Sequence, residues 1–384
     1  MFFRRLSAVI PLAIAVLLTA CGGVAGPSPQ QDKAATATVK NVIVVVMQNR
    51  SFDHLFGTFP AVDGIRPGVA GYTQKDAKGA TVSPMLLTET SVADLPHGRD
   101  EYLRVWDSGA MDKFALYNGD VSLGYYDSST PGVDRLWSWA QQYALDDQFF
   151  TSVMSSAPSN QLFMVAASDN DFPFSVQPFY GPCNTEATAK APYTFTNLGD
   201  QLSQKGVSWA WYQEPLWDCA AGYIAQQNPF QYFTSTHDSP NLRDYSRFSQ
   251  DLASGTLPAV SFVQPAPIHS THPGSGSITD GLEWLDSFLL QVKSSQVWPG
   301  VVVIVLWDEG GGWWDHVPPP QVDQQGYGIR VPLLVISPFA KNNYVSHVQM
   351  DNVSILKFIQ ENWGLPPLNS RNAGAASLGD LFTF

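Results

Sequence analysis

The sequence predicts an α/β sandwich with a mostly parallel central sheet. Two observations support this prediction: uninterrupted apolar, β-branched runs such as 41–47 and 301–306, and helical patterns that lie between runs of this kind. A continuous apolar run is typical of a parallel strand that is covered on both faces. Because strands and helices alternate over most of the chain, we expect one sheet with helices packed against it.

Each element is expected from its own pattern. Strands are predicted at 41–47, 207–212, 259–263, 301–306 and 331–336. One helix, around Leu198 and Leu202, should end at Gly206. Another should present one apolar face made of Leu282, Leu285, Leu289 and Val292. A third is expected to begin at a cap, Asp351 or Asn352, and to end before Gly364, with Leu356, Ile359 and Trp363 facing inward.

Two long segments, about 60–130 and 165–195, show poor periodicity and contain many Gly, Pro and Tyr residues. Long irregular segments in a large compact domain are often loops that face the substrate or form a cap. We therefore expect long loops that form a cap on the sandwich.

The N-terminus has the features of an export signal. Arg4 and Arg5 precede an apolar stretch, 6–18, that is too short for a comfortable membrane span. The stretch ends in Leu18-Thr19-Ala20-Cys21, which resembles a bacterial lipobox, so 1–21 is expected to be a lipoprotein signal peptide with Cys21 lipidated. The alternative is an ordinary secretory peptide with a chance cysteine. In both cases the protein is exported; the lipoprotein would be in the cell envelope, facing the periplasm and touching the membrane through its anchor.

Residues 22–40 are rich in Gly, Ala, Pro, Gln and Thr and predict a flexible tether. The remainder, 41–384, has no second linker or internal repeat, and the chain is 44% hydrophobic, so we expect a single catalytic domain. Besides Cys21, only Cys183 and Cys219 are present, and in an oxidising compartment they are expected to form a disulfide. A free buried pair is the alternative.

The charge balance restricts the partners. The formal net charge is −13, from 21 basic and 34 acidic residues, which argues against a nucleic-acid partner and against electrostatic adhesion to anionic lipid. Many aromatic residues (12 Trp, 22 Phe, 14 Tyr) fit a secreted enzyme with an aromatic-walled cleft. They would equally fit a carbohydrate binder, so composition alone does not decide between the two.

The stretch 307–320, Trp-Asp-Glu-Gly-Gly-Gly-Trp-Trp-Asp-His-Val-Pro-Pro-Pro, follows a predicted buried strand. It places Asp308 and Glu309 at the carboxyl end of that strand, where open α/β sheets have their active sites. Three glycines allow a tight turn, and Asp315 and His316 follow. Carboxylates with an imidazole suit a divalent cation or a reacting phosphate. The alternative is a surface turn with solvated acids.

The first predicted strand also ends in polar residues, Gln48-Asn49-Arg50-Ser51-Phe52-Asp53-His54. Asn49 offers a carbonyl oxygen suited to a metal, and Asp53 and His54 are candidates to orient its ligands. The alternative is a capped helix start, with Ser51 or Asn49 as the cap.

These motifs resemble those of the bacterial phosphoesterase family, which contains phospholipases C and a group of acid phosphatases. Residues 48–57 look like its Glu-Asn-Arg-Ser-Phe-Asp-His motif, and 308–319 look like its Asp-Glu-x-Gly-Gly-x-x-Asp-His-Val-Pro-Pro. Further matches follow in family order: Leu95-Pro96-His97, Asp112-Lys113-Phe114, Gly124-Tyr125-Tyr126, Thr271-His272-Pro273, the run 328–332, Ser337-Pro338, His347, Asp351 and Ser354. The resemblance covers roughly residues 40 to 372.

The resemblance implies an alkaline-phosphatase-like fold, with a central sheet between two helix layers, and a metal-assisted Ser or Thr nucleophile. A divalent cation of unknown identity would be held by Asn49, Asp308 and Glu309, with Gln48 at the position of the family's metal-binding Glu. His97, His272 and His316 would bind phosphoryl oxygens, and one would protonate the leaving oxygen. His269 is the alternative to His272, whereas His54 and His347 are expected to be supporting groups.

The chain departs from the family pattern at two positions. Gln48 replaces a metal-binding Glu and removes a full negative charge. The family's nucleophile lies three residues before an Asn, and counting back from Asn160 gives Ala157. We expect Ser159, at the start of a helix where the N–H groups favour an oxyanion, and Ser156 is the alternative. An ordinary N-cap role for Ser159 remains open.

The predicted function is therefore a metal-dependent phosphoric-ester hydrolase that acts through a phosphoserine intermediate. One alternative is a degenerate member that binds a phosphorylated or lipid ligand without turnover. The other is a sulfate- or phosphonate-ester hydrolase on the same fold. The substrate, a soluble phosphomonoester or a phospholipid, stays open. The chain stops at Phe384, and this favours the short phosphatase-like forms.

Overall fold

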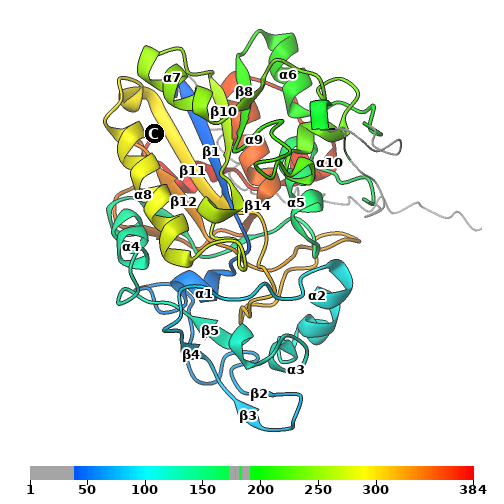
Figure 1. The fold of residues 1–384 in the computed structure, drawn as a ribbon, viewed down its shortest axis with the longest axis vertical. Helices are drawn as coiled ribbons and strands as arrows, with labels where there is room; N and C mark the ends of the chain where they lie inside the picture. Colours follow the sequence, from blue (N-terminus) through cyan, green and yellow to red (C-terminus); the bar gives the residue numbers. More distant parts are fainter. Residues whose placement is uncertain (1–38, 173–177, 179–180, 184–190) are drawn as a thin grey trace, which may run out of the picture. The chain divides into compact units, whose positions relative to one another are not determined.

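The fold is seen in a computed structural model that describes residues 39–172, 178, 181–183 and 191–384 (Figure 1). The residues described from 39 onward fall into one compact unit. The predicted signal peptide with Cys21 and all of the predicted tether except its last two residues lie outside the described residues. No helix in the described part of the chain is long and apolar enough to cross a membrane.

An eight-stranded sheet forms the centre of this unit, in the order β13-β6-β12-β11-β1-β10-β8-β9. All neighbours are parallel except at β12, which is antiparallel to both β11 and β6. The strands are β1 Asn41–Met47, β6 Ala144–Asp146, β8 Trp209–Gln213, β9 Leu242–Asp244, β10 Val260–Gln264, β11 Val301–Trp307, β12 Leu333–Ile336 and β13 Tyr344–Ser346. The predicted mostly parallel sheet is confirmed.

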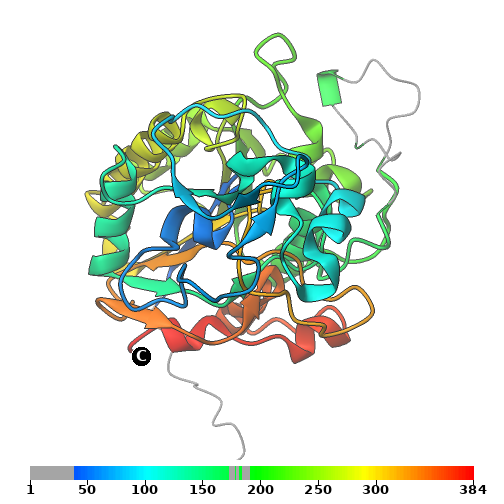
Figure 2. The same ribbon diagram turned by 90° about the horizontal axis from the view of Figure 1, so that it is seen from below.

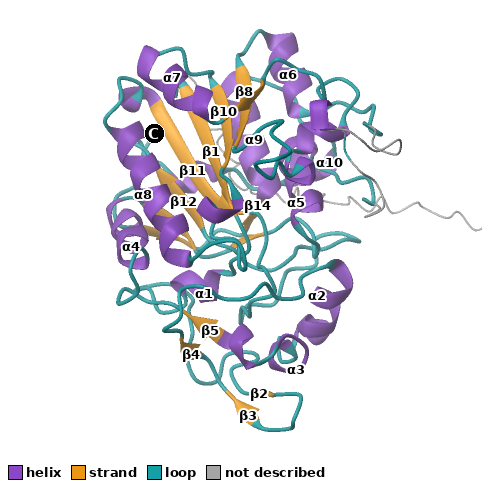
Figure 3. Ribbon diagram, viewed as in Figure 1, coloured by secondary structure: helices purple, strands orange, loops and turns teal. Residues whose placement is uncertain are grey.

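Helices cover both faces of the sheet, so the molecule has the predicted three layers (Figure 3). On one face are α4 Val133–Gln142, α7 Ser246–Ser254 and α8 Ile278–Lys293. On the other are α5 Ala157–Ala166, α6 Leu198–Lys205, α9 Asn352–Trp363 and α10 Ser370–Gly374. The apolar stripe predicted on α8 is buried, because Leu282, Leu285, Leu289 and Val292 are at most 2% exposed. The sandwich fold predicted from the sequence is confirmed.

The long segment predicted as a cap, about 60–130, contains short elements rather than loops alone. After α1 Phe52–Phe56 come β2 Gln74–Lys75, β3 Thr81–Val82, β4 Met85–Leu86, α2 Arg99–Trp106, α3 Phe114–Asn118 and β5 Gly124–Tyr125. These elements lie beyond the carboxyl ends of β1 and β11, and Figure 2 shows them in front of the sheet. We call residues 57–131 the cap. Its apolar side chains, among them Tyr102, Val105 and Phe114, form a small apolar core that also includes Ile329 from outside the cap.

Two further details complete the architecture. A two-stranded ribbon joins β7 Phe149–Phe150 to β14 Met350–Asp351, directly before the segment that leads into α5. Cys183 and Cys219, the pair predicted from the sequence, are joined by a disulfide. The other segment predicted as a loop, 165–195, lies partly outside the described residues.

Candidate functional site

The ends of β1 and β11 bring the two strand-end motifs together. The two strands are parallel neighbours, with Met47 paired to Trp307, so the residues that follow each strand emerge side by side. The backbone N–H of Asn49 donates to Asp308 Oδ1 at 3.3 Å, and Asn49 itself has a left-handed φ of 61°. Gly311 is required here, because a Cβ at this position would lie 2.3 Å from the carbonyl oxygen of Asn49. The glycine turn that follows Glu309 therefore packs directly on the Asn49 backbone.

The acid pair, Asp308 and Glu309, is buried, with each residue 1% exposed. Asp308 Oδ2 accepts from Gln161 Nε2 at 3.3 Å, whereas Glu309 Oε2 accepts from the Tyr102 hydroxyl at 2.6 Å. Burial, followed by repulsion from Glu309, raises the pKa of Asp308 to about 8. Burial also raises the pKa of Glu309. The protein therefore does not balance the charge of the ionised pair by itself.

This deficit fits a divalent cation. The acid pair and the side-chain carbonyl oxygen of Asn49 provide hard oxygen ligands, and a cation among them would favour the ionised carboxylates. The residues predicted from the sequence as the core of a metal site are thus brought together.

Two of the predicted histidines lie on either side of Asn49. Asn49 Nδ2 is 3.3 Å from His97 Nε2 and 3.4 Å from His272 Nε2. In each ring Nδ1 is hydrogen-bonded to a nearby backbone carbonyl, of Leu95 and of Pro273 respectively, so that Nε2 faces the site. The bond to the carbonyl fixes the ring orientation.

The environments of these histidines differ. His97 Nε2 is 3.4 Å from Glu309 Oε1, and the charge of Glu309 raises the pKa of His97. Burial lowers the pKa of His272. His97 is therefore suited to hold a proton. His272 is suited to remain neutral, with its Nε2 as a hydrogen-bond acceptor. His269 pairs with Glu214 at 2.9 Å instead.

Gln48 is turned toward the loop that precedes His272. Its side-chain oxygen accepts a 2.6 Å hydrogen bond from the Ser270 hydroxyl, and the residue is 1% exposed. Its backbone carbonyl accepts from Thr271 Oγ1 at 2.9 Å. The side-chain oxygen of Gln48 is therefore already hydrogen-bonded within the protein, whereas a metal ligand would need an oxygen directed at the cation.

The two candidate serines occupy different positions at the start of α5. Ser156 is the N-cap residue, half-buried, and its hydroxyl has no hydrogen-bond partner among the residues described. Ser159 is 2% exposed in the first turn, with its hydroxyl 3.4 Å from that of Ser155. Gln161, on the next turn, reaches Asp308, so the beginning of α5 lies against the acid pair. Ala157 is the first residue of the helix.

The amide of Asn160 holds the segment before α5 in place. Its Oδ1 accepts from the Val153 N–H at 3.1 Å, and its Nδ2 donates to the Ser155 carbonyl at 2.9 Å. Ser152 is tied at 2.7 Å to the buried carboxylate of Asp351. The conformation around Ser156 is thus fixed by buried hydrogen bonds.

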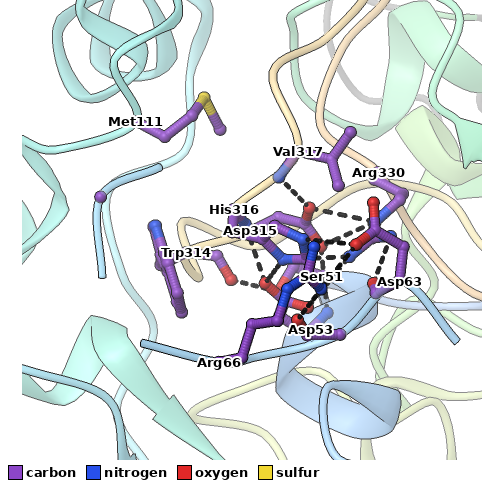
Figure 4. Close-up of polar contacts among 12 residues, drawn as sticks. Ser51, Asp53, Asp63, Arg66, Met111, Trp314, Asp315, His316, Val317 and Arg330 are labelled. Carbon is purple, nitrogen blue, oxygen red and sulfur yellow. Dashed lines mark hydrogen bonds and ion pairs between the residues drawn. The ribbon is translucent and has the colours of Figure 1, made fainter. Parts of the chain in front are cut away.

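His316 is not placed beside His97 and His272. Its Nδ1 is 2.7 Å from Asp53 Oδ2, and its Nε2 is 3.3 Å from Asp63 Oδ1 (Figure 4). Although burial opposes it, the hydrogen bond to Asp53 and its charge hold the pKa of His316 above the ordinary value. The phosphoryl-binding role predicted for His316 has no support from these contacts.

His316 instead belongs to what we call the Arg330 cluster, made of Asp53, Asp315, His316 and Arg330. Ligand atoms of Asp53, Asp315 and His316 lie within 4.8 Å of one another, close enough for a metal. Arg330, which is fully buried, donates to Asp53 Oδ1 at 2.9 Å and to Asp315 Oδ1 at 3.0 Å. A guanidinium thus already supplies the positive charge between these acids.

The other expected supporting histidines are also outside the acid pair. His54 is buried between Arg50 Nη1, at 3.0 Å, and the Gly124 carbonyl, at 2.9 Å. His347 is mostly exposed and pairs with Asp147 at 2.8 Å. Ser51 caps α1 by accepting from the His54 N–H at 3.3 Å. The motif 48–54 therefore does both things: Ser51 caps a helix, and Asn49 lies at the candidate site.

A family model described as "Phosphoesterase family" matches residues 39–366. The chain belongs to the Phosphoesterase family. Among curated proteins, non-hemolytic phospholipase C of Pseudomonas aeruginosa is 26% identical over 402 residues, which cover 89% of this chain and 56% of that protein. Phospholipase C B of Mycobacterium tuberculosis is 26% identical over 425 residues, covering 93% and 78%. The chain thus spans little more than half of the first of these phosphoesterase relatives.

Among solved structures, a protein of the alkaline phosphatase superfamily from Vibrio parahaemolyticus matches 86% of this chain and 67% of its own, with 12% identity and a TM-score of 0.45. The eight-stranded sheet and its two helix layers themselves define the fold. Family membership together with the phospholipase C relatives indicates an ester-bond hydrolase.

Proposed function

We propose that the protein is a metal-dependent phosphoric-ester hydrolase whose cation is bound by Asn49, Asp308 and Glu309. The observation that supports this most is the buried acid pair, whose charge no Lys or Arg among the described residues compensates by a salt bridge. A divalent cation supplies the charge that draws in a phosphate ester and activates a hydroxyl next to it.

We further propose Ser156, rather than the Ser159 preferred from sequence, as the nucleophile. Ser156 is half-buried and its hydroxyl is unengaged within the described residues, whereas Ser159 is buried and contacts Ser155. Its place as N-cap of α5 also lets the first N–H groups of the helix face a phosphate bound there.

The reaction follows from these groups. Ser156 loses its hydroxyl proton to solvent, its Oγ forms a bond to phosphorus while the bond to the leaving oxygen breaks, and His97 gives its proton to that oxygen. Water then attacks the phosphoserine and gives a proton to His97, the Oγ–phosphorus bond breaks, Oγ takes a proton from solvent, and inorganic phosphate or a phosphomonoester leaves. The Nδ1–H of His272 donates to the Pro273 carbonyl, so Nε2 of the neutral ring is an acceptor, and His272 would hold a phosphoryl oxygen through Nε2 only in its protonated form.

The substrate proposed is a phosphate ester, either a soluble phosphomonoester or a phospholipid. The curated relatives are phospholipases C by name, and this favours a phosphodiester between a polar head group and a diacylglycerol. No nucleic-acid partner is proposed, because the net charge is −13. The protein is further proposed to be an exported lipoprotein attached through Cys21, on the motif Leu18-Thr19-Ala20-Cys21 alone.

The test is an assay of the purified protein on p-nitrophenyl phosphate and p-nitrophenylphosphorylcholine, with Mn²⁺, Ca²⁺, Mg²⁺ or Zn²⁺ supplied in turn. Ser156→Ala is expected to lower kcat on the order of 10⁴-fold or more, whereas Ser159→Ala should keep most of the activity. If the wild type hydrolyses neither substrate with any of the cations but binds phosphorylcholine or inorganic phosphate, the binding-only alternative is favoured. Activity on a sulfate ester only would favour the sulfatase alternative.

A further inference from the structure

Two cap residues contact the acid pair in the described structure: His97 pairs with Glu309, and Tyr102 donates a hydrogen bond to it. Tyr102 lies on α2, and Glu309 follows β11 more than two hundred positions later in the chain. The tyrosine is 1% exposed, and its ring packs in the apolar core of the cap with Val105 and Phe114. A phenol in such an apolar environment requires a partner for its hydroxyl.

The hydroxyl has two partners, both at the turn after β11. It donates to Glu309 Oε2 at 2.6 Å and accepts from the Gly312 N–H at 3.2 Å. Glu309 Oε2 also accepts from the Gly311 N–H at 3.3 Å. This oxygen therefore has two donors within the protein, whereas Glu309 Oε1 faces His97 at 3.4 Å.

The arrangement fixes which oxygen of Glu309 is offered to a cation. A short bond from a hydroxyl to a carboxylate is among the stronger hydrogen bonds in proteins, and it favours the ionised form of the acid. With Oε2 held by Tyr102 and Gly311, Glu309 can bind a cation through Oε1 alone. By comparison, Asp308 Oδ2 accepts a longer hydrogen bond, of 3.3 Å, from Gln161 Nε2.

We propose that Tyr102 is a positioning residue for the metal site: it orients Glu309 as a one-oxygen ligand and thereby couples the cap to cation binding. This inference rests on the proposed function, since it requires a cation at Asn49, Asp308 and Glu309. Because the bond runs from α2 to the end of β11, the cap is fastened to the core at the ligand itself. Outer partners of metal ligands commonly alter cation affinity by about 10- to 100-fold.

The experiment measures cation affinity rather than activity. The wild-type protein, freed of metal with a chelator, is titrated with Mn²⁺, Ca²⁺, Mg²⁺ and Zn²⁺ against a fluorescent indicator, and the cation that binds most tightly is kept. The same titration is then run on Tyr102→Phe, which retains the ring. The expected result is a dissociation constant raised about tenfold or more.

Two controls separate this bond from general effects. Tyr117→Phe removes the same hydroxyl from a neighbouring cap helix, α3, where the side chain is 53% exposed, and should leave the dissociation constant unchanged. Thermal unfolding of each metal-free variant reports whether it is folded. Tyr102→Phe is expected to stay folded, and the stabilisation produced by added cation should fall with the logarithm of the loss of affinity.

The outcomes are distinct. Unchanged affinity in folded Tyr102→Phe overturns the role of Tyr102 while leaving the metal site in place. An equal loss in Tyr117→Phe overturns it too, because the effect would then belong to the cap in general. If the wild type binds none of the four cations, or if Asp308→Asn binds as well as wild type, the proposed metal site itself fails.

Discussion

The Arg330 cluster and the acid pair are both buried, and they differ in how their charge is balanced. In the Arg330 cluster, Asp53 and Asp315 share one fully buried guanidinium at 2.9 and 3.0 Å. The acid pair, Asp308 and Glu309, has only His97, at 3.4 Å from Glu309. A buried charge that lacks a partner is strongly unfavourable, so the two clusters must serve different purposes.

The comparison shows that short distances among ligand-type atoms are not enough to identify a metal site. The carboxylates and imidazole of the Arg330 cluster lie close enough to hold an ion, yet hydrogen bonds to Arg330 and backbone N–H groups occupy them. The acid pair has fewer ionisable groups but an unbalanced charge. We infer that the Arg330 cluster has a structural role and joins α1 to the turn after β11, whereas the acid pair binds the cation.

The largest expected effect is at the acid pair. Asp308→Asn should abolish cation binding and lower activity by about a thousandfold or more, because the cation contributes several kcal/mol to the transition state. The variant should remain folded, since its amide oxygen can still accept from the Asn49 N–H and the substitution removes a buried charge. Cation titration and circular dichroism check both points, and retained binding would contradict the assignment.

The second prediction concerns stability. Arg330→Met leaves Asp53 and Asp315 buried without their counter-charge, and unfolding free energy should fall by about 3–5 kcal/mol. The matched control is Arg66→Met, because Arg66 pairs with Asp63 at a largely exposed position. It should cost less than about 1 kcal/mol. Urea denaturation measures both free energies of unfolding. Equal losses in the two variants would show that the Arg330 cluster does not have this stabilising role.

The third prediction concerns pH. In the metal-free protein the pKa of Asp308 is about 8 when folded, above the ordinary value of 3.8. The folded state then holds a proton that the unfolded chain loses, so stability should fall as pH rises between about 4 and 8, by at most about 1.4 kcal/mol per pH unit from this group.

Asp308→Asn isolates this contribution, since the difference in unfolding free energy between variant and wild type should grow with pH in that window and then level off. Saturating cation should remove the trend. A difference that is flat between pH 4 and 8 would mean that the acid pair is already ionised in the metal-free fold.

The smallest expected effect is at Gln48. Gln48→Glu restores a negative charge beside Asn49 and should tighten cation binding about tenfold. Ser270→Ala, which removes the hydroxyl bonded to the Gln48 oxygen, is the companion variant. If the affinity rises only when both changes are combined, the Ser270 bond is what keeps this side chain away from the cation. Indicator titration distinguishes the cases.

The sequence predicted the centre of the sheet better than its edge. The strand expected at 41–47 is β1 itself, and that expected at 301–306 is one residue shorter than β11. Both are continuous β-branched runs, which fully buried strands require. The three-residue strands β6 and β13 have no such run, and the antiparallel direction of β12 depends on pairing with distant segments.

The candidate site could also be predicted only in part. Asn49, Asp308 and Glu309 could be predicted to meet, because adjacent parallel strands end at one edge of the sheet. The position of His316 could not, because the glycine turn after Glu309 carries the chain to Asp53 and Arg330.

Tyr102 and Ser270 gave no signal in the sequence, since each acts through a single hydrogen bond to a distant segment. Gln161 follows the Asn160 that marked the nucleophile region, and a helical step from Ala157 to Gln161 could have suggested that it faces the site.

The most direct test is the position of a bound cation in crystals of the protein grown with Mn²⁺. Anomalous diffraction should give one peak, within coordination distance of Asn49, Asp308 and Glu309, and none in the Arg330 cluster. A peak at Asp53, Asp315 and His316 would contradict the account. So would the absence of a peak at the acid pair in crystals with saturating Mn²⁺, if the protein is active with Mn²⁺ in solution.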